Sequence, residues 1–125
     1  MRTLRRGIAV AIVLVGAIAP ARAQKATEQF IPIGQSPGIS QKQTTISEIV
    51  DVDPRQRTLT ITEGSARRTV KTTEKTRIFL DRSRLKQTNL EGSFADLQKG
   101  RRVEVKYLDP SRRDVADWVK VEIDR

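Results

Sequence analysis

Apolar and polar residues alternate with a period of two from Thr44 to the end of the chain, which is the pattern of β-strands with one buried face. In the first strand, Val50 and Val52 share a face, and a bulge near Glu48 accounts for the break in the alternation before them. A turn at Asp53-Pro54 follows, because proline presets the backbone angle of the second turn residue. The pattern therefore predicts a β-rich domain that opens with a bulged strand.

The second and third strands form a hairpin across the sequence EGSARRTV. Threonines line the outward face of the second strand, which favours a strand. We predict a register that places Ile61 opposite Val70 and Glu63 opposite Arg68. The third strand, residues 68–80, has one break near the sequence TTEK.

The last hairpin, in RRVEVKYLDPSRRDVADWVKVEI, has the most specific register. One alignment turns four valines inward and gives the outward face two opposite-charge pairs and one cation beside an aromatic ring. A slip by one residue would lose all three outward pairs and expose the valines. The predicted inward pairs are Val103–Val121 and Val105–Val119, and the outward pairs are Arg102–Glu122, Glu104–Lys120 and Lys106–Trp118.

A short helix is predicted between the third and fourth strands, in SFADLQKG. Ser93 is a typical N-cap with Asp96 three residues later, and Gly100 stands just past the end. Five strands with one helix at that place is the order of an OB-fold barrel. We therefore predict an all-β fold with one short helix, a five-stranded OB-like barrel over residues 44–125.

The N-terminus has the pattern of a secretory signal peptide. Three arginines precede an uncharged apolar run, Gly7–Ala19, and the site Ala21-Arg22-Ala23 follows, so cleavage is expected after residue 23. The run has 13 residues, whereas a helix needs about 20 to span a bilayer, so the alternative of a permanent membrane anchor is disfavoured. We predict a Sec-exported bacterial protein, periplasmic or secreted, with residues 1–23 removed.

Residues 24–43 read as an extended arm or linker before the barrel. The arm contains the apolar sequence FIPIG, in which Pro32 excludes a central strand, and then a turn at Ser36-Pro37-Gly38. A stretch this apolar is expected to lie against its own barrel, over Trp118 or an open sheet edge. The alternative is that the arm reaches a partner.

Composition excludes several kinds of chemistry. The chain has no Cys and no His, which removes disulfides, thiol and histidine nucleophiles and the usual transition-metal ligands. Ser83-Arg84-Leu85-Lys86 matches a Ser-x-x-Lys pattern without its companion motifs, and Asp51-Val52-Asp53 lacks the rest of a calcium loop. We predict no catalytic residues, no metal site and no cofactor, with carboxylate or serine–lysine hydrolase chemistry as the remote alternative.

The net charge falls when the predicted signal peptide is removed. Residues 1–23 carry four of the 24 Lys and Arg, so the mature chain has 20 against 15 Asp and Glu, a net charge of +5 rather than +9. Together with export, this argues against nucleic acid as a partner. Guanidinium groups suit phosphates and carboxylates, so the expected partner is an anionic envelope polymer, lipid or protein.

The candidate binding residues are basic side chains of two loops and an outward face. Arg55 and Arg57 in the first loop, with Arg112 and Arg113 in the last, would border one groove on an OB barrel. Trp118 is the only Trp and is predicted to face outward beside Lys106 and Lys120, where it stacks on a ligand or is covered by the arm.

These features predict a non-catalytic binding or interaction module. A structural or assembly factor that acts through its arm is the alternative, and charged loops on an ordinary soluble hairpin protein are the simplest interpretation of the arginines.

Three segments carry a resemblance to a known family. SFADLQKGRRVEVKY, the upstream TEKTRIFLD and the closing ADWVKVEI resemble a widespread secreted bacterial domain of unknown function, a small OB-like barrel. The match would cover residues 44–125; where the family usually has a glycine near the start of its first strand, this chain has Thr44-Thr45. The resemblance implies the fold and an extracytoplasmic location, and it implies no activity.

Overall fold

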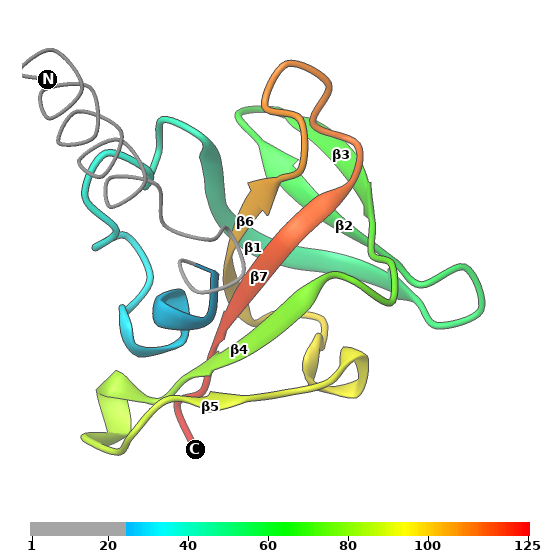
Figure 1. Ribbon diagram of the computed structural model, residues 1–125. Helices are drawn as coiled ribbons and strands as arrows, with labels where there is room; N and C mark the ends of the chain where they lie inside the picture. Colours follow the sequence, from blue (N-terminus) through cyan, green and yellow to red (C-terminus); the bar gives the residue numbers. More distant parts are fainter. Residues whose placement is uncertain (1–24) are drawn as a thin grey trace, which may run out of the picture.

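The computed structural model describes residues 25–125, which form one seven-stranded sheet and three short 3-10 helices (Figure 1). The predicted signal peptide and Gln24 lie outside the described residues. Within the described part, no helix is long and apolar enough to cross a membrane. The strands are β1 (Thr44–Asp53), β2 (Thr58–Glu63), β3 (Ala66–Lys71), β4 (Arg77–Asp81), β5 (Leu90–Glu91), β6 (Arg102–Tyr107) and β7 (Ala116–Glu122), and the helices are η1 (Glu28–Phe30), η2 (Ser83–Leu85) and η3 (Phe94–Asp96).

Strand β1 lies between β2 and β6 in the sheet, whose order is β3-β2-β1-β6-β7-β4-β5. Its first half pairs with β6 and its second half with β2. The predicted bulge is present, but it falls between Ile49 and Asp51 rather than near Glu48. One extra residue there lets both Ile49, opposite Ile61, and Val52, opposite Leu59, face the core.

The predicted register of the last hairpin is confirmed. Strands β6 and β7 pair Val103 with Val121 and Val105 with Val119, and all four valines are fully buried. Outward partners also match: Lys106 lies opposite Trp118, and the guanidinium of Arg102 lies 3.7 Å from a carboxylate oxygen of Glu122. The alternation of valines and charges in the sequence was therefore sufficient to fix this part of the sheet.

The predicted register of the β2–β3 hairpin is wrong by two positions. Glu63 pairs with Ala66 across a two-residue turn, so that Leu59 rather than Ile61 lies opposite Val70. Gly64 has φ +63°, the conformation that two-residue hairpin turns require. A shift of two keeps every residue on its predicted face, and the ion pair between Glu63 and Arg68 still forms, diagonally, at 2.8 Å.

The predicted count of five strands and one helix also needs correction. The predicted third strand is divided into β3 and β4, because residues 73–76 form a turn in which the Thr76 hydroxyl accepts the Thr73 N–H and donates to the Ala116 carbonyl. Strand β5 was not predicted. The predicted helix is the single 3-10 turn η3, capped by Ser93 and Asp96 as expected. It ends at Asp96, and the next residue, Leu97, is extended and buried in the core.

The two halves of that divided strand both meet β7. Strand β4 runs parallel to β7, and Lys71 at the end of β3 forms a parallel bridge with Val115 just before β7. The side chains between these strands form one buried cluster, to which β1, β2, β3, β4, β6, β7 and η3 all contribute. The sheet thus wraps a single core, with η3 packed at one end.

Candidate functional site

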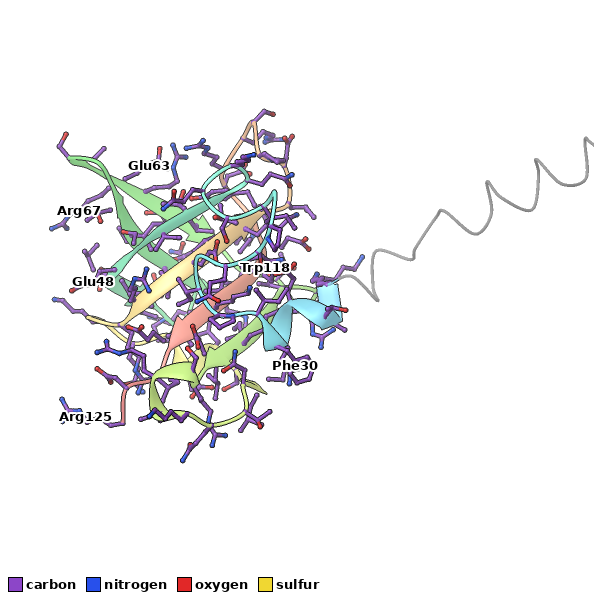
Figure 2. The ribbon with its side chains drawn as sticks, turned by 90° about the vertical axis from the view of Figure 1, so that its left-hand side faces the viewer. Phe30, Glu48, Glu63, Arg67, Trp118 and Arg125 are labelled. Carbon is purple, nitrogen blue, oxygen red and sulfur yellow. The ribbon has the colours of Figure 1, made fainter. Side chains whose placement is uncertain are left out.

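The N-terminal arm, residues 25–43, lies against the outer side of the sheet beside β4, β6 and β7 (Figure 1). It is not extended as predicted. It contains η1 and then the predicted turn, in which the Ile39 and Ser40 N–H groups donate to the Ser36 carbonyl. Ile33 is buried, whereas Phe30 stays 60% exposed on the outer side of η1 (Figure 2). The arm therefore packs on its own sheet with Ile33 buried, whereas Phe30 stays outside.

A buried ion pair joins the arm to β7. The Lys120 ammonium lies 2.9 Å from Glu28 Oε1 and donates to Ser36 Oγ at 3.1 Å. The Ser36 hydroxyl in turn donates to the Glu28 carboxylate. Lys120 faces outward from the sheet, yet it is only 1% exposed. The arm thus supplies the counter-charge that lets this cation be buried.

Two further carboxylates of the sheet each accept one hydrogen bond from the arm. Glu104 accepts the Gly34 N–H of the arm at 2.9 Å and the Thr44 hydroxyl of β1 at 2.8 Å. Asp81 accepts the Ile33 N–H of the arm at 2.9 Å, and its other oxygen accepts the Ser83 N–H and hydroxyl. The predicted cross-strand neighbours Glu104 and Lys120 are in register, and each binds a group of the arm.

Trp118 faces outward, as predicted, but it is covered. Its ring lies 4.5 Å below the Lys120 ammonium and is 1% exposed, where the arm crosses the sheet (Figure 2). The sequence left two possibilities for Trp118, stacking on a ligand or cover by the arm, and in the structure the arm covers it. Trp118 and Lys120 are consequently closed to any external ligand while the arm is docked.

Lys106 belongs to a third contact of the arm. Its ammonium lies 3.2 Å from Asp117, and the Lys25 ammonium of the arm lies 2.8 Å from the other oxygen of the same carboxylate. Burial alone would raise the pKa of Asp117, but the hydrogen bonds from Lys25 and Lys106 outweigh it and leave the pKa below its ordinary value. Lys106 is therefore neutralised rather than free to attract an anion.

The four loop arginines are not brought together. Arg113 lies 3.3 Å from Glu63, at the end of β2, and stands over the Tyr107 ring at 6.0 Å. Arg112 lies 3.4 Å from Asp114. Arg57 directly precedes the first residue of β2, whereas the Arg113 side chain lies at Glu63, the last residue of that strand. The single groove expected from the sequence is not formed by these four side chains.

The β1–β2 turn holds Arg57 in a defined position. The Asp53 carboxylate accepts the Arg55 and Gln56 N–H groups, and the Arg57 carbonyl accepts the N–H and hydroxyl of Thr72. Arg57 takes φ +56° to make this turn. Its guanidinium lies 5.1 Å from the centre of the Phe94 ring. Stacking on an aromatic face keeps a guanidinium oriented while leaving its N–H groups available.

A groove of about 590 Å³ lies between this turn and η3. Its lining is largely apolar, with Arg57 and Lys99 as cations and Asp51 as the acid; the apolar residues are Val52, Pro54, Phe94, Ala95 and Leu97. Within residues 25–125, neither Arg55, Arg57 nor Lys99 forms an ion pair. We call this site the Arg57 groove. The sequence identified Arg57 as a site residue but not Phe94 and Lys99, because η3 lies about 40 positions further along the chain.

The structure gives no support to the remote catalytic alternatives. The Ser83 hydroxyl, at the first residue of η2, donates to Asp81 at 2.6 Å rather than bonding Lys86. In the described part of the chain no group of three His, Cys, Asp or Glu side chains is placed to hold a metal ion. No protein-family model, curated protein or solved structure matches this chain.

Proposed function

We propose that this chain is a non-catalytic binding module of the bacterial envelope that recognises an anionic amphiphile in the Arg57 groove. The ligand has a phosphate or carboxylate group attached to an apolar chain. The observation that carries the proposal is the combination of two cations without carboxylate partners in the described residues and an apolar lining. By contrast, four of the other predicted cations, Lys106, Arg112, Arg113 and Lys120, each lie beside a carboxylate. Arg55 has no ion pair among the described residues, but it does not line the groove.

The lining determines which part of such a ligand goes where. Arg57 and Lys99 attract the anionic group, and the guanidinium can take a phosphate or carboxylate with two parallel N–H donors. Phe94, Leu97 and Pro54 offer apolar surface to the chain of the ligand. Asp51 repels a second anionic group at its side of the groove. A singly headed amphiphile therefore fits better than a uniformly charged polymer.

The architecture supports an OB-like barrel as the scaffold. Strand β1 pairs with both β2 and β6, strand β4 runs parallel to β7, and the Lys71–Val115 bridge brings β3 to the same strand. With β3 and β4 counted as the two parts of one strand and β5 set aside, this is the strand order of an OB barrel with its helix reduced to η3. The groove then lies between the first loop and that helix.

The envelope location rests on the sequence. The signal-peptide pattern of residues 1–23 and the resemblance to a secreted bacterial domain both favour export. Acidic phospholipids and other anionic amphiphiles are abundant there, so the proposed ligand class is one that an exported protein would meet.

Two probes test the proposal with residues 24–125. Octyl phosphate, followed by NMR chemical shifts, tests recognition of a soluble amphiphile, and vesicles of phosphatidylcholine with or without phosphatidylglycerol test recognition of a membrane headgroup. We expect binding that weakens with salt and falls about tenfold, about 1.4 kcal/mol, for each of R57Q and K99Q. The matched control R112Q/R113Q should bind as the wild type does.

The vesicle and octyl phosphate experiments distinguish the two sources of the ligand. Binding to octyl phosphate alone indicates a soluble amphiphile, and binding to phosphatidylglycerol vesicles as well indicates a membrane lipid. Equal binding to neutral and anionic vesicles with no response to octyl phosphate would overturn the proposal, as would an equal loss of affinity in R112Q/R113Q.

A further inference from the structure

The outer face of β6 and β7 recognises a specific pattern of polar groups on the arm. From N- to C-terminus the arm presents an ammonium (Lys25), a carboxylate (Glu28) and then two backbone N–H groups, those of Ile33 and Gly34. The sheet presents complementary groups at matching positions, namely Asp117, Lys120, Asp81 and Glu104. The sheet side of the seam has three carboxylates and one ammonium, that of Lys120. A uniformly acidic segment would therefore meet a carboxylate, and a uniformly basic segment would meet Lys120, so each would face at least one like charge.

Polar contacts dominate the seam. Of the apolar side chains in the FIPIG sequence, Ile33 is 6% exposed, whereas Phe30 is 60% exposed. Water can replace the hydrogen bonds and ion pairs when the arm lifts, but lifting also uncovers the Trp118 ring, which is 1% exposed under the docked arm. An open seam is therefore unfavourable, and an arm that leaves its own sheet is expected to be replaced by another arm of the same pattern.

A short, strained connection joins the arm to β1. Gln41 has φ +66°, which is uncommon for a residue other than glycine, and residues 41–43 are exposed. The Gln41 N–H donates to the Thr44 hydroxyl, and the Lys42 and Gln43 N–H groups donate to the Ile39 carbonyl. If these residues extended, the arm would continue in the direction of β1 and point away from its own sheet, and the strain at Gln41 would be released. Short hinges under strain are known to favour exchange of elements between copies.

We propose that the partner of this surface is a second copy of the chain, which exchanges arms reciprocally. In the exchanged dimer the arm of each copy lies on β6 and β7 of the other, and every contact of the seam is kept because both copies carry the same pattern. The dimer is two-fold symmetric and closed, so it does not lead to fibres. The exchange leaves the Arg57 groove untouched, since that groove is built from the β1–β2 turn and η3.

A charge-reversal complementation tests the exchange. In E28K a lysine of the arm meets the native Lys120, and in K120E the native Glu28 meets a glutamate of the sheet, so self-docking is unfavourable in each variant alone. In a mixture, the E28K arm suits the K120E sheet and the K120E arm suits the E28K sheet. We expect the equimolar mixture to form a heterodimer of twice the monomer mass by light scattering, and each variant alone to stay monomeric. The control mixture of E48K with K120E should form no heterodimer, because Glu48 is exposed and lies on β1 opposite Arg102, away from the groups that bind the arm.

A second variant keeps the test decisive if the reversed charges prevent folding. Deletion of Lys42 and Gln43 keeps every seam contact but removes the turn closed on the Ile39 carbonyl, so the shorter connection disfavours self-docking and this protein should be more dimeric than the wild type. Q41G, which relieves the strain, should shift the wild-type equilibrium toward monomer. A monomeric deletion variant with native circular dichroism, or a mixture of folded E28K and K120E that remains monomeric, would overturn the proposal.

Discussion

Removal of the Glu28 carboxylate tests whether the arm is docked in solution. In E28A the Lys120 ammonium loses its only carboxylate partner among residues 25–125 and retains the Ser36 hydroxyl and the Trp118 ring. Its side chain is 1% exposed, so water does not reach it unless the arm lifts. The variant must therefore either keep a buried, poorly compensated charge or give up the docking of the arm.

The burial of the pair sets the size of the effect. Removing one partner of a buried ion pair costs about 3–5 kcal/mol. The Glu28 side chain retains 11% exposure, and lifting of the arm limits the loss, so we expect the lower end, about 3 kcal/mol of unfolding free energy. For a domain of about 100 residues, the unfolding entropy near the midpoint is about 0.2 kcal/mol/K, which converts this loss to a fall in Tm of about 14 °C.

Thermal unfolding and tryptophan fluorescence measure the two consequences. Trp118 is the only Trp of the chain, so a red shift of its emission below the transition would report lifting of the arm. E74A is the matched control, an exposed Glu→Ala change expected to alter stability by less than about 0.5 kcal/mol. The double variant E28L/K120M, which replaces the pair by apolar groups, should recover most of the loss. A Tm for E28A equal to that of E74A, with unchanged Trp118 emission, would show that the reasoning is wrong.

Three further predictions concern pH and packing. The pKa of Asp117 in the folded chain is below its ordinary value of 3.8. Its ionised form therefore contributes fully to folding stability above pH 3.8, and this contribution is lost as the pH falls through the folded-state pKa. We expect the arm to loosen below about pH 4, and D117N to lack this part of the pH dependence of stability. G92A should lose about 1–3 kcal/mol in urea denaturation, because a Cβ at Gly92 would lie 2.6 Å from Leu80 Cδ2, and wild-type stability would contradict the tight packing. Burial raises the pKa of Tyr107, so its phenol should ionise above pH 10.0 in an ultraviolet titration, and ionisation at or below that pH would indicate an open site.

The sequence predicted the strands best where hydrophobic pattern and charge pairing agree. In the last hairpin, a slip by one residue would have exposed valines and separated charges, so only one register was acceptable. In the β2–β3 hairpin, two registers that differ by two residues bury the same side chains, and the conformation of Gly64 in the turn decides between them. Periodicity alone carries no information on that choice.

The candidate sites were harder to predict because they join segments without periodic pattern. Trp118 and Lys120 were correctly placed on the outward face, but their burial depends on Glu28 and Ser36, which belong to an irregular segment about 90 positions earlier. In the Arg57 groove, likewise, the arginine was identified as a loop cation, while its aromatic neighbour comes from η3. Tertiary contacts of this kind become visible only in the folded chain.

The pairing of Glu28 with Lys120 also has a consequence for the order in which the molecule is made. The arm is synthesised first among the described residues, whereas its docking strand is synthesised last, with 92 positions between the two side chains. At roughly 5–20 residues per second, the arm of a nascent chain waits on the order of 5–20 seconds before its own docking surface exists. During that interval a copy whose own arm has not yet docked offers the same surface, so the concentration of such copies during synthesis, rather than only the final equilibrium, would decide how often arms are exchanged.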